Sequence, residues 1–349
     1  MADIAPLATT PGASTARGKG QVTPTIALVA ALALVPVVAA AFDDPFLVRI
    51  AARIIIFAIA AVSLNLILGF GGLVSLMHAG LFGGGGYVVA ILAHHDYDAS
   101  PLVPGLTALA GTANLGFSIP IAIAIAGLVS LITGVVALRT RGSYFIMITL
   151  AFNEMLYYFF VASQKYGGQD GLQILASLHV FGFEVGRRVP FYYSALAVLA
   201  LVLFGLGRLV DSRFGMVLRA CAQNDRRVIA LGVPSLRYKL TAFVLSGMIA
   251  GLAGALWATS QQFISPADMS WVRSGDLVVM TVLGGIGAVW GPVIGTIAFL
   301  VLELMLASLT TYWALPFGLL VIGMVVFLNG GLVGLWARVA VARGARRHG

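Results

Sequence analysis

Apolar segments long enough to cross a membrane recur along nearly the whole chain and constrain its fold more than any other feature. A membrane-spanning helix needs about 20 mostly apolar residues. Such segments occur near residues 25–42, 47–68, 73–93, 118–138, 143–162, 190–210, 238–259, 275–290, 291–308 and 313–330. Only 10% of the residues are charged, against about 25% in soluble domains. We therefore predict an all-α integral membrane protein, a bundle of about ten transmembrane helices, some of them broken by glycine.

The distribution of positive charge predicts how this bundle is oriented. Residues 208–239 form the densest basic stretch and lie between two apolar segments; the basic residues are Arg208, Arg213, Arg219, Arg226, Arg227, Arg237 and Lys239. Cytoplasmic loops carry an excess of Lys and Arg, so we place this stretch in the cytoplasm. Alternating outward from it puts both termini inside. The chain then divides into a disordered cytoplasmic tail (1–23), a transmembrane domain (24–335) and a basic cytoplasmic tail (336–349).

The basic stretch also contains a short segment with helical character. Apolar residues recur between Val217 and Leu231, and Gly232 and Pro234 follow as stop signals. Two interpretations remain open at this point. The stretch is either a solvated cytoplasmic loop or a short helix that docks into a partner protein.

Several classes of function are disfavoured by the residues present. The segment from Gly12 to Lys19 has the wrong spacing for a phosphate-binding loop, and Gly20 follows the lysine where Ser or Thr is needed. ATP-driven work would therefore need another subunit, and we expect no cofactor bound by this chain. The single cysteine, Cys221, excludes an internal disulfide, and no His/Cys cluster suggests a metal site. The net charge of +8 does not indicate nucleic acid, because the cations flank apolar segments. No nucleophile–base spacing supports an enzyme.

A glycine-rich run between Gly69 and Tyr87 predicts a broken helix. It contains four successive glycines, Gly83 to Gly86, and each weakens a helix by about 1 kcal/mol relative to alanine. Opened backbone at membrane depth is tolerated only against protein or a water-filled cavity. We expect this segment in the protein interior, either beside a solute path or in close helix packing.

Ionisable residues inside the apolar segments are the candidates for a translocation path, because such groups face a cavity or a partner. Besides His78 and Glu154, these ionisable residues are Arg53, Glu303 and Asp276. One arrangement that we consider is an ion pair between Glu154 and Arg53 across the bundle. Our candidates for lining the path are His78 and Glu154, together with Asn65 and Ser75, whose hydrogen-bonding side chains flank the first glycine break. Each has an alternative interpretation as a satisfied structural group.

Six motifs in order along residues 60–330 resemble the branched-chain amino acid ABC transporter permeases, specifically the LivM-type subunit. They are Ser63–Ala79, Arg141–Glu154, Gly167–Leu172, Arg237–Leu256, Phe263–Pro266 and Leu283–Pro292. The resemblance implies a permease that works with a second, LivH-like permease subunit, two ATP-binding subunits and a periplasmic solute-binding protein. It also implies an amino acid substrate and a place in the lipid bilayer of a bacterial inner membrane.

The resemblance further implies that residues 208–239 are the loop that couples the permease to its ATPases. The positions matching the family's pattern are Gly215, Arg219, Ala220, Asn224, Asp225, Ala230 and Gly232. The chain departs from the pattern at Gln223–Asp225, where Glu-Asn-Glu is common, and at Met77, where glycine is usual. Three alternatives stay open: a urea or short-amide ABC permease, a secondary transporter driven by ions through Glu154 or Glu303, and a structural membrane protein.

Overall fold

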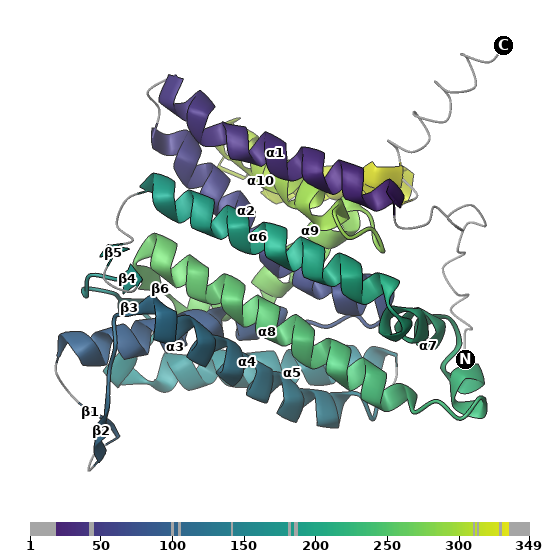
Figure 1. The fold of residues 1–349 in the computed structure, drawn as a ribbon, viewed down its shortest axis with the longest axis horizontal. Coiled ribbons are helices and arrows are strands. Elements are labelled where there is room, and N and C mark those ends of the chain that lie inside the picture. Colours follow the sequence, from purple (N-terminus) through teal and green to yellow (C-terminus); the bar gives the residue numbers. More distant parts are fainter. Residues whose placement is uncertain are drawn as a thin grey trace.

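The computed structural model describes residues 19–41, 45–98, 101–103, 106–140, 142–180, 183–184, 188–309, 311–312, 314–327 and 330–334. Helices dominate them (Figure 1). The α-helices are α1 (Lys19–Ala41), α2 (Pro45–Asn65), α3 (His78–Tyr97), α4 (Leu115–Ala137), α5 (Ser143–Ala162), α6 (Arg188–Asp211), α7 (Arg213–Ala230), α8 (Ser235–Gln261), α9 (Trp271–Gly284), α10 (Gly291–Leu309) and α11 (Ala314–Phe327). A π-helix, η1 (Leu66–Phe70), extends α2, and the 3-10 helices are η2 (Gln164–Tyr166) and η3 (Pro266–Met269).

Short antiparallel strand pairs lie at one end of the bundle, and α7 lies at the other (Figure 1). Strand β1 (Pro101–Val103) pairs with β2 (Leu106–Ala110), and β4 (His179–Val180) pairs with β5 (Phe183–Glu184). The third pair joins two loops far apart in the sequence, because β3 (Leu172–Gln173) pairs with β6 (Phe263–Ile264).

The prediction of a helical membrane protein with several spans is confirmed. Every predicted apolar segment overlaps one of the helices α1 to α6 or α8 to α11. Six helices in the described residues are long and apolar enough to cross a membrane: Phe46–Phe70, Leu115–Ala137, Ser143–Ala162, Val189–Asp211, Ser235–Gln261 and Gly291–Leu309. Thr25–Val37 and Ala314–Met324 form shorter apolar helices. The count of ten spans and the cytoplasmic location of both termini stay predictions.

The predicted tails lie largely outside the described residues. Residues 1–18 and 335–349 are not among them, so the basic tail at 336–349 is not described. The last residues of the predicted N-terminal tail 1–23 belong to α1, which begins at Lys19.

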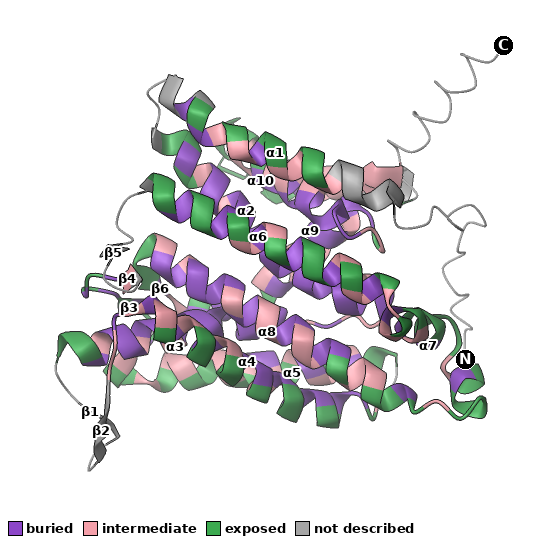
Figure 2. Cartoon of the chain, viewed as in Figure 1, coloured by how far each residue is buried: buried purple, intermediate pink, exposed green. Residues whose placement is uncertain are grey.

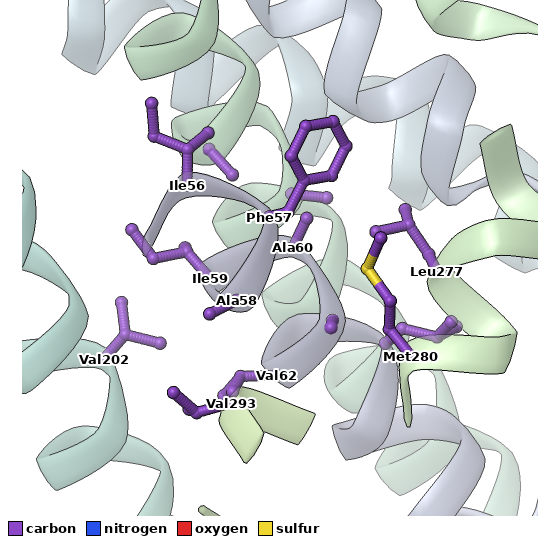
Figure 3. Close-up of a cluster of buried hydrophobic side chains, with 14 of the residues drawn as sticks. Ile56, Phe57, Ala58, Ile59, Ala60, Val62, Val202, Leu277, Met280 and Val293 are labelled. Carbon is purple, nitrogen blue, oxygen red and sulfur yellow. The ribbon is translucent and has the colours of Figure 1, made fainter. Parts of the chain in front are cut away.

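Helix α2 is at the centre of the bundle. In its apolar window 89% of the residues are buried, against 22% for α5, which lies at an edge (Figure 2). Around α2, Ile59 and Val62 lie among side chains from three other helices, with Val202 on α6, Met280 on α9 and Val293 on α10 (Figure 3). Because lipid is as apolar as these side chains, their contribution to helix association is close packing rather than escape from water.

The expectation that Gly83–Gly86 breaks a helix is wrong. All four residues lie inside the continuous helix α3. The physical reason is close packing against α8: a Cβ on Gly85 would overlap the backbone oxygen of Gly251. Small residues let membrane helices approach closely, and the contact between α3 and α8 offsets the low helix propensity of glycine. The glycine break that we predicted between Asn65 and Ser75 is present, because residues 71–77 are not helical and connect η1 to α3.

Candidate functional site

The helix break at residues 71–77 is the centre of the candidate site. It follows η1, whose residues still belong to the apolar helix Phe46–Phe70, and it ends where α3 begins at His78. Gly72 has a positive φ of 65°, a backbone conformation that glycine adopts without strain. The chain therefore leaves helical geometry at Gly72, which is exposed, whereas Gly71 before it and Ser75 and Met77 after it are buried.

Neighbouring helices supply hydrogen bonds to the opened backbone. The Leu76 N–H donates to Thr149 Oγ1 of α5 over 3.2 Å. Ser274 Oγ of α9 donates to the Leu76 carbonyl over 2.7 Å and accepts from the Ala79 N–H over 3.1 Å. Unpaired backbone groups in a bilayer cost several kcal/mol each, so these two hydroxyls make the break tolerable.

Asn153 of α5 holds the start of α3 in the same way. Its Oδ1 accepts from the Gly80 N–H over 2.7 Å, and its Nδ2 donates to the Met269 carbonyl over 2.8 Å. The side chain is fully buried and so connects α3, α5 and η3. Sequence reasoning missed Asn153, although a lone amide inside an apolar helix next to Glu154 is a detectable signal.

His78, a predicted path residue, is buried and joined to α8. Its Nε2 lies 2.7 Å from Ser246 Oγ, and the Ser246 hydroxyl donates its hydrogen to the Ser63 carbonyl. Ser246 must therefore accept from an Nε2–H group, which leaves Nδ1 of His78 as an unprotonated acceptor. This Nδ1 has no partner within the described part of the chain.

The predicted path residues Asn65 and Ser75 are also occupied by internal contacts. Asn65 Nδ2 donates to the Ala288 carbonyl over 2.8 Å, and its Oδ1 accepts from the Gly287 N–H over 3.3 Å. The amide thus fastens the end of α2 to the turn between α9 and α10. Ser75 Oγ accepts from the Met77 N–H over 3.3 Å, just before α3. A role for these residues toward a solute stays a prediction.

Glu154 differs from the other three because its side chain is partly exposed. Its nearest described partner is Asn153, whose Nδ2 lies 3.4 Å from Oε1. The pair that we considered between Glu154 and Arg53 does not form. Arg53 instead contacts Glu303 on α10, with Nη2 3.1 Å from Oε1, because α10 packs against α2.

Helix α7, the expected coupling helix, consists of two pieces. Asn224 has φ −156° and ψ 94°, which interrupts the helix. Its Oδ1 accepts from the Arg227 N–H over 3.1 Å, so Asn224 caps the second piece. Gly232, with φ 81°, ends it: its N–H donates to the Ile229 carbonyl and the Val233 N–H to the Val228 carbonyl. This is the left-handed cap that glycine favours.

The predicted coupling residues fall into two groups: an inner group, which contacts the helices of the bundle, and an outer group, which is exposed on the surface of α7. On the inner side, Gly215 is buried against Val210 at the end of α6, and Arg219 Nη2 donates to the Val210 carbonyl over 3.0 Å. Asp225 forms an ion pair with Lys239 of α8, with 3.0 Å between Oδ1 and Nζ. On the outer side, Ala220, Asn224, Ala230 and Gly232 are exposed.

The inner side of α7 reaches the helix break directly. A Cβ on Gly72 would lie 3.1 Å from the Ala222 side chain of α7. Beside this contact is a cavity of about 470 Å³ between α7, the start of α8, the α4–α5 connection and residues 71–73. Asp225, Lys239 and the thiol of Cys221 line it. Burial raises the pKa of this thiol above its usual value. The geometry joins the helix at one end of the bundle to the opened backbone inside it.

Comparisons with known proteins agree with this architecture. The family model described as "Branched-chain amino acid transport system / permease component" matches residues 46–337. The high-affinity branched-chain amino acid transport system permease protein LivM of Escherichia coli K12 is 28% identical over 333 residues, covering 86% of this chain and 74% of that protein.

Two further relatives match about half of the chain. The probable branched-chain amino acid transport permease protein LivH of Methanocaldococcus jannaschii is 30% identical, over 48% of this chain and 52% of that protein. The L-arabinose ABC transporter permease protein AraH of Azospirillum brasilense is 28% identical, over 47% of each. No solved structure matches the chain.

Proposed function

This chain belongs to the family of branched-chain amino acid transport permease components, and on that basis we propose that it is a permease subunit of an ABC importer for branched-chain amino acids in a bacterial inner membrane. Its partners are a second, LivH-like permease subunit, two ATP-binding subunits and a periplasmic solute-binding protein. The ATP-binding subunits hydrolyse ATP, and this chain binds no cofactor of its own.

In the proposed topology the chain crosses the membrane about ten times with both termini in the cytoplasm. Helix α7 then lies on the cytoplasmic side and the strand pairs on the periplasmic side. The position of α7 and the strands at opposite ends of the bundle supports this orientation (Figure 1). The basic residues of 208–239 support it as well, because cytoplasmic loops are enriched in Lys and Arg.

The observation that carries the proposal is the two-sided contact surface of α7. Apolar side chains of α7 and of the residue after it are exposed, with Met216 64% and Leu231 82% exposed, as are Arg226 and Arg227. An amphipathic helix of this kind fits an apolar groove in a partner protein. Its inner side touches Gly72 through Ala222.

This arrangement gives a route from ATP to the membrane segment. Closure of the ATP-binding subunits moves α7 as a rigid body, and the Ala222–Gly72 contact transmits the displacement to residues 71–77. ATP binding favours one conformation of the break, and hydrolysis releases it. The solute passes Asn65, Ser75, His78 and Glu154. Asn65 must exchange its internal hydrogen bonds to contact the solute, because both polar atoms of its amide are engaged, whereas the partly exposed Glu154 needs no such exchange.

Purification of the complex followed by reconstitution tests the proposal. We expect an ATP-binding subunit to copurify, and ATP together with loaded binding protein to drive leucine uptake into vesicles. Uptake by this chain alone under a proton or sodium gradient would instead identify a secondary transporter. Glu303 is a poor ion carrier for that alternative, because its carboxylate is paired with Arg53 over 3.1 Å. Uptake of urea or short amides in place of leucine would identify a urea or short-amide ABC permease.

A further inference from the structure

A second group of charged side chains lies apart from the helix break. It comprises Arg53 on α2, Asp268 in η3, Arg273 and Asp276 on α9, and Glu303 on α10. Both arginines lie near the ring of Phe57, with the guanidinium carbons of Arg53 and Arg273 5.8 Å and 5.4 Å from its centroid. Elements far apart in the sequence thus bring two cations and three carboxylates together.

The two arginines in this group are held differently. Arg53 forms hydrogen bonds with both oxygens of Glu303, at 3.1 Å and 3.2 Å. The Arg273 guanidinium lies 3.5 Å from Asp276 and 3.8 Å from Asp268, and this guanidinium makes no hydrogen bond within the described part of the chain. A guanidinium has five N–H donors in a fixed fork that fits a carboxylate. Arg273 is therefore an ion-paired cation whose hydrogen-bonding capacity is unused.

Part of this group is accessible at the surface of the single chain. The side chains of Arg273 and Asp276 are 27% and 30% exposed in the single chain, and charged side chains near a membrane interior face a cavity or a partner. The group is also next to α5, because Asn153 donates to the carbonyl of Met269, the residue after Asp268.

We propose that Arg273 and Asp276 bind the two charges of the transported amino acid, with the carboxylate at the Arg273 guanidinium and the ammonium at the Asp276 carboxylate. The Arg53–Glu303 pair and the Phe57 ring position this site. A cation and an anion one helical turn apart match a zwitterion, whereas urea or a short amide carries no net charges to pair with them. The inference rests on the proposed function, since it assigns residues to the substrate of that importer.

Transport by the reconstituted full complex tests the site, with leucine uptake and ATP hydrolysis measured on the same vesicles. The variants are Arg273→Gln and Asp276→Asn, and the matched control is Asp98→Asn, which removes the carboxylate that pairs with His94 over 3.2 Å at the end of α3. A hydrogen bond to a charged group contributes about 1.5–3 kcal/mol, so we expect uptake to fall about tenfold to hundredfold in each site variant. Binding-protein-stimulated ATP hydrolysis stays at the wild-type rate, and the control keeps both activities.

The outcomes separate this inference from the proposed function. A wild-type complex that shows no ATP-driven leucine uptake contradicts the proposed function itself. If the wild type transports leucine and the site variants do so equally well, only the inference is wrong. Loss of uptake together with ATP hydrolysis indicates a structural role and also overturns it. Should Arg273→Gln fail to assemble, Arg273→Lys keeps the charge without the planar fork, and the same fall in uptake with normal ATP hydrolysis is expected.

Discussion

Nη2 of Arg53 lies 3.1 Å from Oε1 and 3.2 Å from Oε2 of Glu303, which joins α2 to α10 within two apolar helices. Replacing Glu303 with Gln leaves the cation without its counter-ion. We expect a loss of about 1–2 kcal/mol in stability, below the cost for a fully buried pair because both side chains are partly exposed. Thermal unfolding in detergent measures it. The double variant Arg53→Met/Glu303→Leu should lie near the wild type, and a double variant as unstable as the single one would contradict this account.

Two adjacent glycines of α3 are expected to respond in opposite ways to alanine. A Cβ on Gly84 meets nothing within 4 Å, so Gly84→Ala gains about 1 kcal/mol of helix propensity. A Cβ on Gly85 overlaps the backbone oxygen of Gly251, and such overpacking costs about 1–3 kcal/mol. The two melting temperatures, measured side by side, check the prediction. Equal shifts in the same direction would show that the α3–α8 contact is not the reason for these glycines.

Replacing Asn153 with Leu is expected to destabilise the start of α3. The change keeps the branched shape and the number of heavy atoms but leaves the Gly80 N–H and the Met269 carbonyl without their partner. An unsatisfied buried polar group costs about 1–3 kcal/mol, so the loss should exceed that of most single substitutions. Limited proteolysis and thermal unfolding measure it. The neighbouring Glu154→Gln is the matched control and should unfold like the wild type.

Gly232 offers a test of the cap on α7 that separates backbone strain from crowding. No atom lies within 4 Å of a Cβ placed there, but φ is 81°. The left-handed conformation costs a residue with a side chain about 1–2 kcal/mol, and a β-branched residue suffers most. Gly232→Val should therefore abolish uptake while membrane insertion stays normal, whereas Gly232→Asn should retain uptake.

Bulky replacements at Asn224 and Asp225 should act in the same way as Gly232→Val, because they remove the cap of the second piece of α7 and its ion pair with Lys239. Normal uptake in these variants would refute a coupling role for the helix.

Cys221 is a reporter of α7 movement. Burial raises the pKa of its thiol, so less thiolate is present at neutral pH and a maleimide should react slowly, with a rate that increases as the pH rises toward the raised pKa. If ATP binding moves α7 away from residues 71–73, the rate should increase when ATP is added to the complex. Cys221→Ser removes the only cysteine and provides the blank. A rate that is the same with and without ATP would argue against movement at this contact.

The positions of the helices were predictable from the sequence because each apolar segment carries its own length signal. The break between Asn65 and Ser75 was predicted correctly, whereas the weakening expected at Gly83–Gly86 does not interrupt α3. Only the neighbour distinguishes the two glycine runs: α8 fills the space beside Gly85, whereas Thr149 and Ser274 provide hydrogen bonds to the backbone after Gly72.

The residues predicted to line a path were found by their polarity, and polarity alone does not reveal a partner. The Asn65 amide and Nε2 of His78 are bonded to groups more than a hundred residues away in the sequence, Ala288 and Ser246. The predicted pair between Arg53 and Glu154 failed for the same reason. The sequence does not show whether α5, which carries Glu154, or α10, which carries Glu303, packs on α2. The stop signal at Gly232 was read correctly, since a cap is a local feature.

The antiparallel pairing of β3 with β6 ties the loop after α5 to the loop after α8 through backbone hydrogen bonds, extended by the Ile174 N–H to the Gln262 carbonyl. Exchanging one of these loops for that of a related transporter would leave the other without its register. The two loops therefore form one structural unit. A chimera designed to bind a different partner at this end of the bundle must exchange both loops together.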